Sequence, residues 1–293
     1  MTSVVESLTQ ARSKYRRIFF RPEFGNAGDA LINAGFYTLA RDLGLEYTEV
    51  TGGRRDVPEA SADDLVVMAG GGALSSHWDI GRLSLEALTR SPAALLVLPQ
   101  SIQGNEEALR RLRPTDTLFV RERFSHEHAR SLGLACPVHL DDDVALSLDP
   151  ELVLSSSRPR VPRSVDDLRR DAAFARHRVR AARGLPLLAW RADAEAKNAD
   201  HGALRRDDIS ILCDFGSLNR ADNLYSAWWL LTIVSWYQRV ETDRLHVGVA
   251  AALLGKPVVM HANAYFKIRG VYEQSLKDHP VYGPLVTYAE DRS

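Results

Sequence analysis

Basic and titratable side chains gather in the C-terminal third of the chain, at positions that predict an anion-binding site. Arg244 and His246 stand at the expected start of a helix, and Lys267 and Arg269 follow a second strand in an expected basic loop. A helix N-terminus presents free N–H groups and a partial positive charge. An arginine fork grips a carboxylate or phosphate with two parallel hydrogen bonds. The spacing predicts a pocket for a small polyanion, although an ordinary β-α-β unit with a surface arginine and a satisfied histidine fits it equally well.

Short strands must carry these side chains to one edge of a sheet. We expect Thr242 to cap the helix, Gly255 to end it, and residues 258–260 to form the next buried strand. Upstream, the apolar run 187–190 predicts a strand that delivers Arg191. Ligands of open α/β sheets lie beyond the carboxyl ends of the strands, and Arg191 should project from that edge, although an arginine-aspartate pair at the edge of a domain is unremarkable by itself.

The rest of the chain alternates short apolar runs with amphipathic segments, which predicts an α/β fold with parallel sheets covered on both sides. Composition changes at residues 155–184, where nine arginines lie between Arg158 and Arg183. We interpret this stretch as a linker with a basic helix between two Rossmann-like domains, residues 1–154 and 185–293. Two such domains facing a cleft resemble the glycosyltransferase-B architecture. The arginines fit a solvated helix face, or contact with an anionic lipid-phosphate-linked saccharide or the membrane surface.

Bulk composition excludes several classes of protein. The net charge of −1 over 293 residues argues against a nucleic-acid partner. Two cysteines, Cys136 and Cys213, allow no disulfide framework or CxxC metal site and favour a reducing, cytoplasmic location. The N-terminal residues lack the apolar core of a signal peptide. Residues 224–240 are apolar, but they fit a buried helix better than a membrane span.

Two glycine-containing turns follow expected strands in the N-terminal half. Gly25–Asp29 reads as a tight strand-to-helix turn, and Gly70–Gly72 follows the run 65–69. Neither is a phosphate-binding loop of the Walker type or a GxGxxG turn, so there is no nucleotide-binding fingerprint. Asp141–Asp143 contains a DxD, which could hold a divalent ion or simply cap the next turn. We predict no metal.

Seven sequence blocks, taken in order, resemble the polysaccharide pyruvyl transferase family. They are GNAGDALI (25–32), GGGAL (70–74), LPQSI (98–102), VRERFS (120–125), RADAE (191–195), TDRLHVGVAAALLGKPVV (242–259) and NAYFKIR (263–269). The resemblance runs from about Phe20 to about Leu276. One position departs: the family usually has glycine after the histidine, where this chain has Val247.

The resemblance implies phosphoenolpyruvate as donor, with about three negative charges near neutral pH, and no further cofactor. It implies His246 as the general acid or the group that stabilises departing phosphate, and Asp29 as an acceptor-side base. The donor-binding set would be Arg191, Arg244, Lys267, Asn263 and Tyr265. The acceptor and loop set would be Gly25, Asn26, Gly28, Gly70, Gly71, Gly72, His77, Asp193 and Glu195.

The implied reaction transfers pyruvate to a sugar of an exopolysaccharide or cell-surface repeat unit as a ketal. The acceptor would be linked to polyprenyl diphosphate, and the enzyme would be cytoplasmic, at the inner face of the membrane. Two alternatives remain open: a sugar-nucleotide-dependent glycosyltransferase of the same architecture, and a non-catalytic scaffold in polysaccharide assembly.

Overall fold

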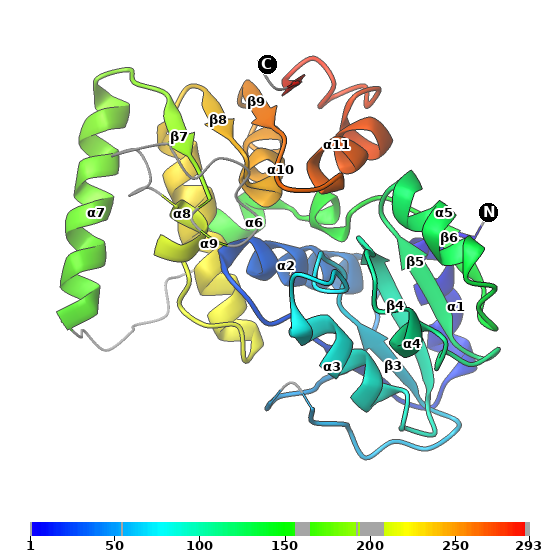
Figure 1. Ribbon diagram of the computed structural model, residues 1–293. Coiled ribbons are helices and arrows are strands. Elements are labelled where there is room, and N and C mark those ends of the chain that lie inside the picture. Colours follow the sequence, from blue (N-terminus) through cyan, green and yellow to red (C-terminus); the bar gives the residue numbers. More distant parts are fainter. Residues whose placement is uncertain (1, 54, 156–164, 192, 194–207, 291–293) are drawn as a thin grey trace.

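The computed structural model describes residues 2–53, 55–155, 165–191, 193 and 208–290, with no account of the side chains of residues 165–168. Two parallel sheets, with strand orders β2-β1-β3-β4-β5-β6 and β10-β9-β8-β7, form a mixed α/β protein (Figure 1). This confirms the α/β class and the parallel pairing. The division into two glycosyltransferase-B-like domains stays a prediction.

The first sheet takes its strands from the N-terminal half. Its central strands are buried on both faces, as the unbroken apolar runs predict. Helices α1 and α2 cover one face, and α3, α4 and α5 cover the other. The strands are β1 (Ile18–Arg21), β2 (Thr48–Glu49), β3 (Leu65–Met68), β4 (Ala94–Gln100), β5 (Thr117–Val120) and β6 (Val138–Leu140). The helices are α1 (Val4–Lys14), α2 (Ala27–Asp42), α3 (Asp79–Leu88), α4 (Glu106–Leu109) and α5 (Arg123–Ser131).

The second sheet comes from the C-terminal half and is shorter. Its strands are β7 (Leu187–Ala189), β8 (Val240–Thr242), β9 (Val258–His261) and β10 (Val286–Ala289). Its helices are α8 (Ile209–Leu212), α9 (Arg220–Trp236), α10 (Leu245–Leu253) and α11 (Lys267–Val271), followed by a π-helical stretch, Tyr272–Leu276. In chain order, a 3₁₀ turn η1 (Val144–Ser147), α6 (Pro150–Ser155) and α7 (Val165–Ala182) come between the last strand of the first sheet and the first strand of the second.

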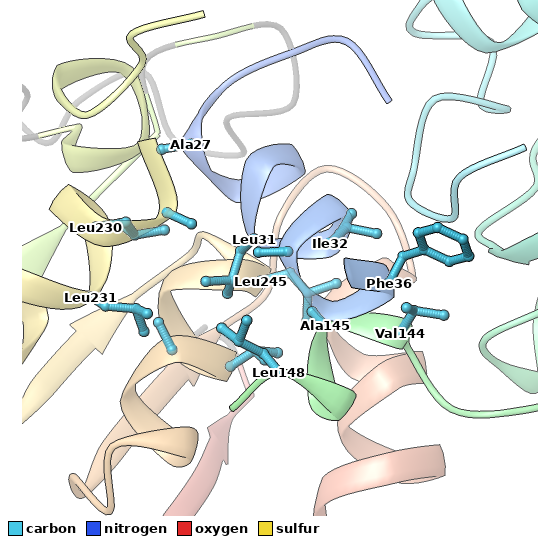
Figure 2. Close-up of a cluster of buried hydrophobic side chains, with 14 of the residues drawn as sticks. Ala27, Leu31, Ile32, Phe36, Val144, Ala145, Leu148, Leu230, Leu231 and Leu245 are labelled. Atoms are coloured by element: carbon cyan, nitrogen blue, oxygen red, sulfur yellow. The ribbon is translucent and has the colours of Figure 1, made fainter. Parts of the chain in front are cut away.

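Helix α2 joins the two halves. Almost all of its length is buried, and Figure 1 shows it between the two sheets. Apolar side chains of α2, η1, α9 and α10 meet around it, among them Leu31, Val144, Leu230 and Leu245 (Figure 2). This cluster continues into the inner faces of both sheets, so one apolar core holds them together.

Two local predictions were wrong. Thr242 ends β8 instead of capping α10: its hydroxyl donates to Ala189 O at 2.7 Å and accepts from Arg244 N–H at 2.9 Å. Arg244 therefore occupies the N-cap position. Lys267 and Arg269 lie in helix α11 and not in a loop, because Ile268 and Val271 bury their side chains in the core at helical spacing.

The arginine-rich stretch is helical over residues 165–182, and residues 156–164 lie outside the described part of the chain. Phe174 fixes α7 by stacking on Trp229 of α9, with ring centroids 3.9 Å apart. Arg176 and Arg178 are exposed, as is Arg183 just after the end of the helix, and α7 lies at the side of the molecule away from the first sheet (Figure 1). Among the described helices, none is long and apolar enough to cross a bilayer.

Candidate active site

A cavity of about 620 Å³ opens where the start of α2, the start of α10 and the loops after β1, β3, β5 and β7 meet. Most of the residues predicted for the site contribute to its wall. They are Gly25, Asn26, Gly28, Asp29, Gly72, Arg191, Asp193, Arg244, His246 and Lys267.

The starts of α2 and α10 approach each other within van der Waals distance. A Cβ atom on Gly28 would lie 3.0 Å from His246 Nδ1 and 3.1 Å from His246 Cβ. Asn26 and Asp29 form a capping box at the start of α2, in which Asp29 Oδ2 accepts from Asn26 N–H at 2.9 Å. Two helix N-termini thus add their partial positive charge to one cavity.

Arg121, which the sequence did not mark as a site residue, supplies a buried guanidinium to the wall. It follows β5 directly and is fully buried. Its Nη1 donates to Asp143 Oδ2 at 2.6 Å and its Nε to Ser101 Oγ at 2.8 Å. Its Nη2 is buried and has no hydrogen-bond partner among the residues that the structure describes. A guanidinium N–H left unsatisfied in this way is costly, and it fits an anion in the cavity.

Gly72 separates Arg121 from Lys267. A Cβ atom here would lie 3.1 Å from Arg121 Nη2 and 3.4 Å from Lys267 Nζ, so glycine lets both cations reach the same part of the wall. Lys267 is largely buried at the first position of α11, with Nζ 5.2 Å from the centre of the Tyr265 ring. Arg121 and Lys267 come from opposite halves of the chain.

His246 lies beside this cationic pair. Its Nε2 is 3.4 Å from both Asp143 Oδ2 and Arg121 Nη1. Burial acts to raise the pKa of Asp143, but Arg121 and His246 outweigh burial and hold that pKa well below its usual range. Asp143 is therefore ionised at neutral pH and can orient both neighbours.

Arg191 and Arg244 also face the cavity, but carboxylates occupy their guanidinium groups. Asp193 accepts from Arg191 Nε at 2.8 Å and lies 2.8 Å from Arg244 Nη2. Arg244 also forms a two-point ion pair with Asp208, and Asp243 accepts from the Arg191 backbone N–H at 2.7 Å. To bind a ligand with both nitrogens of the guanidinium group, these arginines would first have to release the Asp193 and Asp208 carboxylates.

Acidic side chains also line the cavity. Glu23, in the loop before α2, is buried, and burial followed by the charge of Asp29 raises its pKa to about 8. Burial likewise raises the pKa of Asp214. Glu23 was not among the predicted site residues, because nothing in its neighbourhood along the chain indicates that a carboxyl there is desolvated.

Several residues predicted for the site lie elsewhere. Within the described part of the chain, the cavity lining does not include Gly70, Gly71, His77, Asn263 or Tyr265. His77 and Tyr265 contact each other, with ring centroids 5.2 Å apart. Gly70 packs against the backbone at Pro99, where a Cβ would lie 2.7 Å from the carbonyl oxygen. Glu195 lies outside the described residues.

The DxD stretch does not gather its carboxylates. Asp141 accepts from Val4 N–H at 2.6 Å and Asp143 binds Arg121. Over the residues that the structure describes, no group of three or more His, Cys, Asp or Glu side chains could hold a metal ion.

Fold and cavity together define an α/β protein with a cationic site at the carboxyl ends of its strands. The family model for polysaccharide pyruvyl transferase matches residues 26–265, and the chain belongs to this family. A functionally uncharacterized protein from Klebsiella pneumoniae has a similar crystal structure, with a TM-score of 0.72 and 22% identity over 99% of each chain. At that identity the likeness shows the fold alone. No curated protein sequence matches.

Proposed function

We propose that the chain transfers pyruvate from phosphoenolpyruvate to a sugar, forming a pyruvyl ketal. Family membership supports the transferase class. The observation that carries the choice of donor is the buried, unpartnered Nη2 of Arg121 next to Lys267 and His246 in the cavity. Phosphoenolpyruvate has about three negative charges near neutral pH, which suits this cationic wall and the two helix starts.

In this proposal Arg121 and Lys267 hold the phosphate or carboxylate of the donor. His246 lies 3.4 Å from the Arg121 guanidinium, where it can protonate or stabilise the departing phosphate. Asp193 lies 2.8 Å from both Arg191 and Arg244. In this proposal its carboxylate can leave the two arginines and accept a hydrogen bond from a hydroxyl of the acceptor. Asp29 has one oxygen committed to its cap and can act on the acceptor only through the other.

We place the acceptor on a lipid-linked oligosaccharide of an exopolysaccharide or cell-surface repeat unit, handled at the inner membrane face. The exposed Arg176 and Arg178 of α7, with Arg183 just after its end, support this placement, because guanidinium groups attract anionic lipid headgroups and diphosphates.

The first experiment separates this donor from the sugar nucleotides of a glycosyltransferase. Purified protein is mixed separately with phosphoenolpyruvate and with a panel of sugar nucleotides, and the unfolding temperature is followed. Phosphoenolpyruvate should raise the unfolding temperature, and the sugar nucleotides should not. The reverse result, a rise with a sugar nucleotide but not with phosphoenolpyruvate, would support a glycosyltransferase instead.

The second experiment identifies the product. Lipid-linked oligosaccharides from cells with and without the chain are compared by mass spectrometry. One species should differ by the mass of a pyruvyl ketal. His246→Gln should abolish the difference, and retention of the ketal in that variant would remove His246 from the reaction.

A further inference from the structure

Glu23 is a buried carboxyl in the cavity that the roles assigned above leave unused. It lies between β1 and α2, it is 4% exposed, and its side chain faces the same space as Asp29. A buried carboxyl without a salt bridge favours its protonated form, because desolvation penalises the charge.

The nearest arginine along the chain does not neutralise Glu23. Arg21 sends Nη1 to Asp56 O at 3.0 Å and Nη2 to Gly53 O at 2.6 Å, so these two nitrogens serve backbone carbonyls. The positive charge of Arg21 lowers the pKa of Glu23, but burial and Asp29 raise that pKa by more. Asp29, on α2, faces Glu23 with the same sign of charge. The other charged groups lining the cavity belong to other elements: Arg121 after β5, Arg191 and Asp193 after β7, Asp214 after α8, and Arg244, His246 and Lys267 on α10 and α11.

A network of buried amides holds the backbone of Glu23 in place. Asn33 on α2 accepts from Glu23 N–H at 2.9 Å and donates to Glu23 O at 2.9 Å. It also donates to Asn223 Oδ1 on α9 at 2.8 Å, and Asn223 in turn donates to the Tyr37 hydroxyl at 3.2 Å. Gly25 N–H donates to Ser217 Oγ at 3.2 Å. The carboxyl itself is held by the next residue, since Phe24 N–H donates to Glu23 Oε1 at 3.1 Å. A loop pinned to both halves of the core therefore leaves this carboxyl little freedom.

We propose that Glu23 is the proton shuttle of ketal formation: it gives a proton to the methylene carbon of the enol donor and takes one back from the attacking sugar hydroxyl. This inference rests on the proposed function. Its grounds are the position of the carboxyl in the cavity, the clamp by Asn33, and the placement of Asp29 and Arg21. The raised pKa of about 8 agrees with a group that carries a proton at neutral pH.

The step balances as follows. The π electrons of the enol take the Glu23 proton, so the methylene becomes a methyl group and the oxygen-bearing carbon becomes cationic. A sugar hydroxyl forms a C–O bond to that carbon, and its proton returns to the Glu23 carboxylate. A second hydroxyl forms the next C–O bond as the bond to phosphate breaks, and its proton leaves with the phosphate. Diol and phosphoenolpyruvate give ketal and inorganic phosphate, with Glu23 regenerated.

The kinetic test compares wild type with Glu23→Gln and Glu23→Asp, using phosphoenolpyruvate and the lipid-linked acceptor found by mass spectrometry. Glu23→Gln should lower kcat by about 10² or more, the usual size of a general acid–base contribution. The KM for phosphoenolpyruvate in Glu23→Gln should stay within about threefold of the wild-type value. The kcat of Glu23→Asp should lie between the values of wild type and Glu23→Gln. Wild-type kcat should decline as pH rises above about 8, and this limb should be absent from the residual activity of Glu23→Gln. Unchanged kcat and pH profile in Glu23→Gln would overturn the proposal.

Glu49→Gln is the matched control. Burial also raises the pKa of Glu49, but this residue lies in β2 outside the cavity lining. Its substitution should leave kcat and the pH profile unchanged.

A titration of the full chain tests the proton on Glu23 without any substrate. Protein labelled with ¹³C at glutamate side-chain carboxyls should show one resonance that titrates near pH 8 and is missing from Glu23→Gln. If every glutamate titrates below about pH 6, the proposal is overturned. If wild type releases no phosphate from phosphoenolpyruvate, the proposed function fails, and this titration still decides whether Glu23 holds a proton at neutral pH.

Discussion

Gly28 and His246 come from helices more than 200 residues apart in sequence, yet a Cβ atom on residue 28 would lie 3.0 Å from His246 Nδ1. The close approach of α2 and α10 therefore depends on glycine at this position, and it decides where the imidazole stands relative to Arg121 and Asp143.

Gly28→Ala should lower activity with little effect on stability. The new methyl group pushes His246 by a few tenths of an ångström, while alanine is favoured over glycine in a helix by about 1 kcal/mol. We expect kcat to fall by about tenfold, because small misplacements of catalytic groups are costly, with the unfolding temperature within a few degrees of wild type. Gly35→Ala is the contrast: its Cβ would lie 2.2 Å from the Val144 carbonyl oxygen, so stability itself should drop. Full activity in Gly28→Ala would contradict the importance of the contact.

Arg121→Lys should weaken donor binding. Lysine keeps a positive charge but loses the planar fork that reaches Asp143, Ser101 and the cavity together. The Kd for phosphoenolpyruvate, measured by calorimetry, should rise tenfold or more. Arg113→Lys serves as control, since Arg113 pairs with Asp116 at 2.9 Å and does not line the cavity. Both variants should lose some stability; equal Kd values in the two would refute a donor role for Arg121.

Asp193→Asn should strengthen donor binding at low salt. The change removes a negative charge that lies 2.8 Å from both Arg191 and Arg244. The Kd for phosphoenolpyruvate should fall by about threefold to tenfold, and the gain should shrink at high salt because of screening. Asp42→Asn, at an exposed ion pair with Arg41, should change nothing. Weaker binding in Asp193→Asn would mean that Asp193 organises the arginines instead of competing with the donor.

Glu23 should make stability fall as pH rises through neutrality. A carboxyl with a pKa of about 8 in the folded chain and about 4.3 in the unfolded chain binds more protons in the folded state between those values. The free energy of unfolding should therefore decrease from about pH 5 to pH 8. Glu23→Gln should remove that slope in urea unfolding at pH 5.5, 7 and 8.5. In Glu107→Gln, a substitution at an exposed position, the free energy of unfolding should vary with pH as in wild type. If Glu23→Gln also kept the wild-type slope, the pKa of Glu23 would not be raised in the folded chain.

The sequence was sufficient for most of the order of strands and helices and for many of the residues that line the cavity. Periodicity and turn residues are local signals, so β3, β7 and β9 were predicted close to their observed bounds. Side chains placed directly after strands, such as Arg191, were expected at the sheet edge and lie in the cavity wall. The same signal could have found Arg121, which directly follows the apolar residues of β5.

By itself, then, the sequence determined the α/β class, the family blocks and the set of residues near the strand ends. Only the tertiary structure decided which cations keep a group available for a ligand: Asp193 and Asp208 occupy Arg191 and Arg244, while Arg121 Nη2 stays unpartnered. It also decided that Glu23 is desolvated. The physical reason is that ion pairing and burial depend on distances between segments that are far apart in the chain, such as Arg121 and His246, and no local pattern of residues encodes those distances.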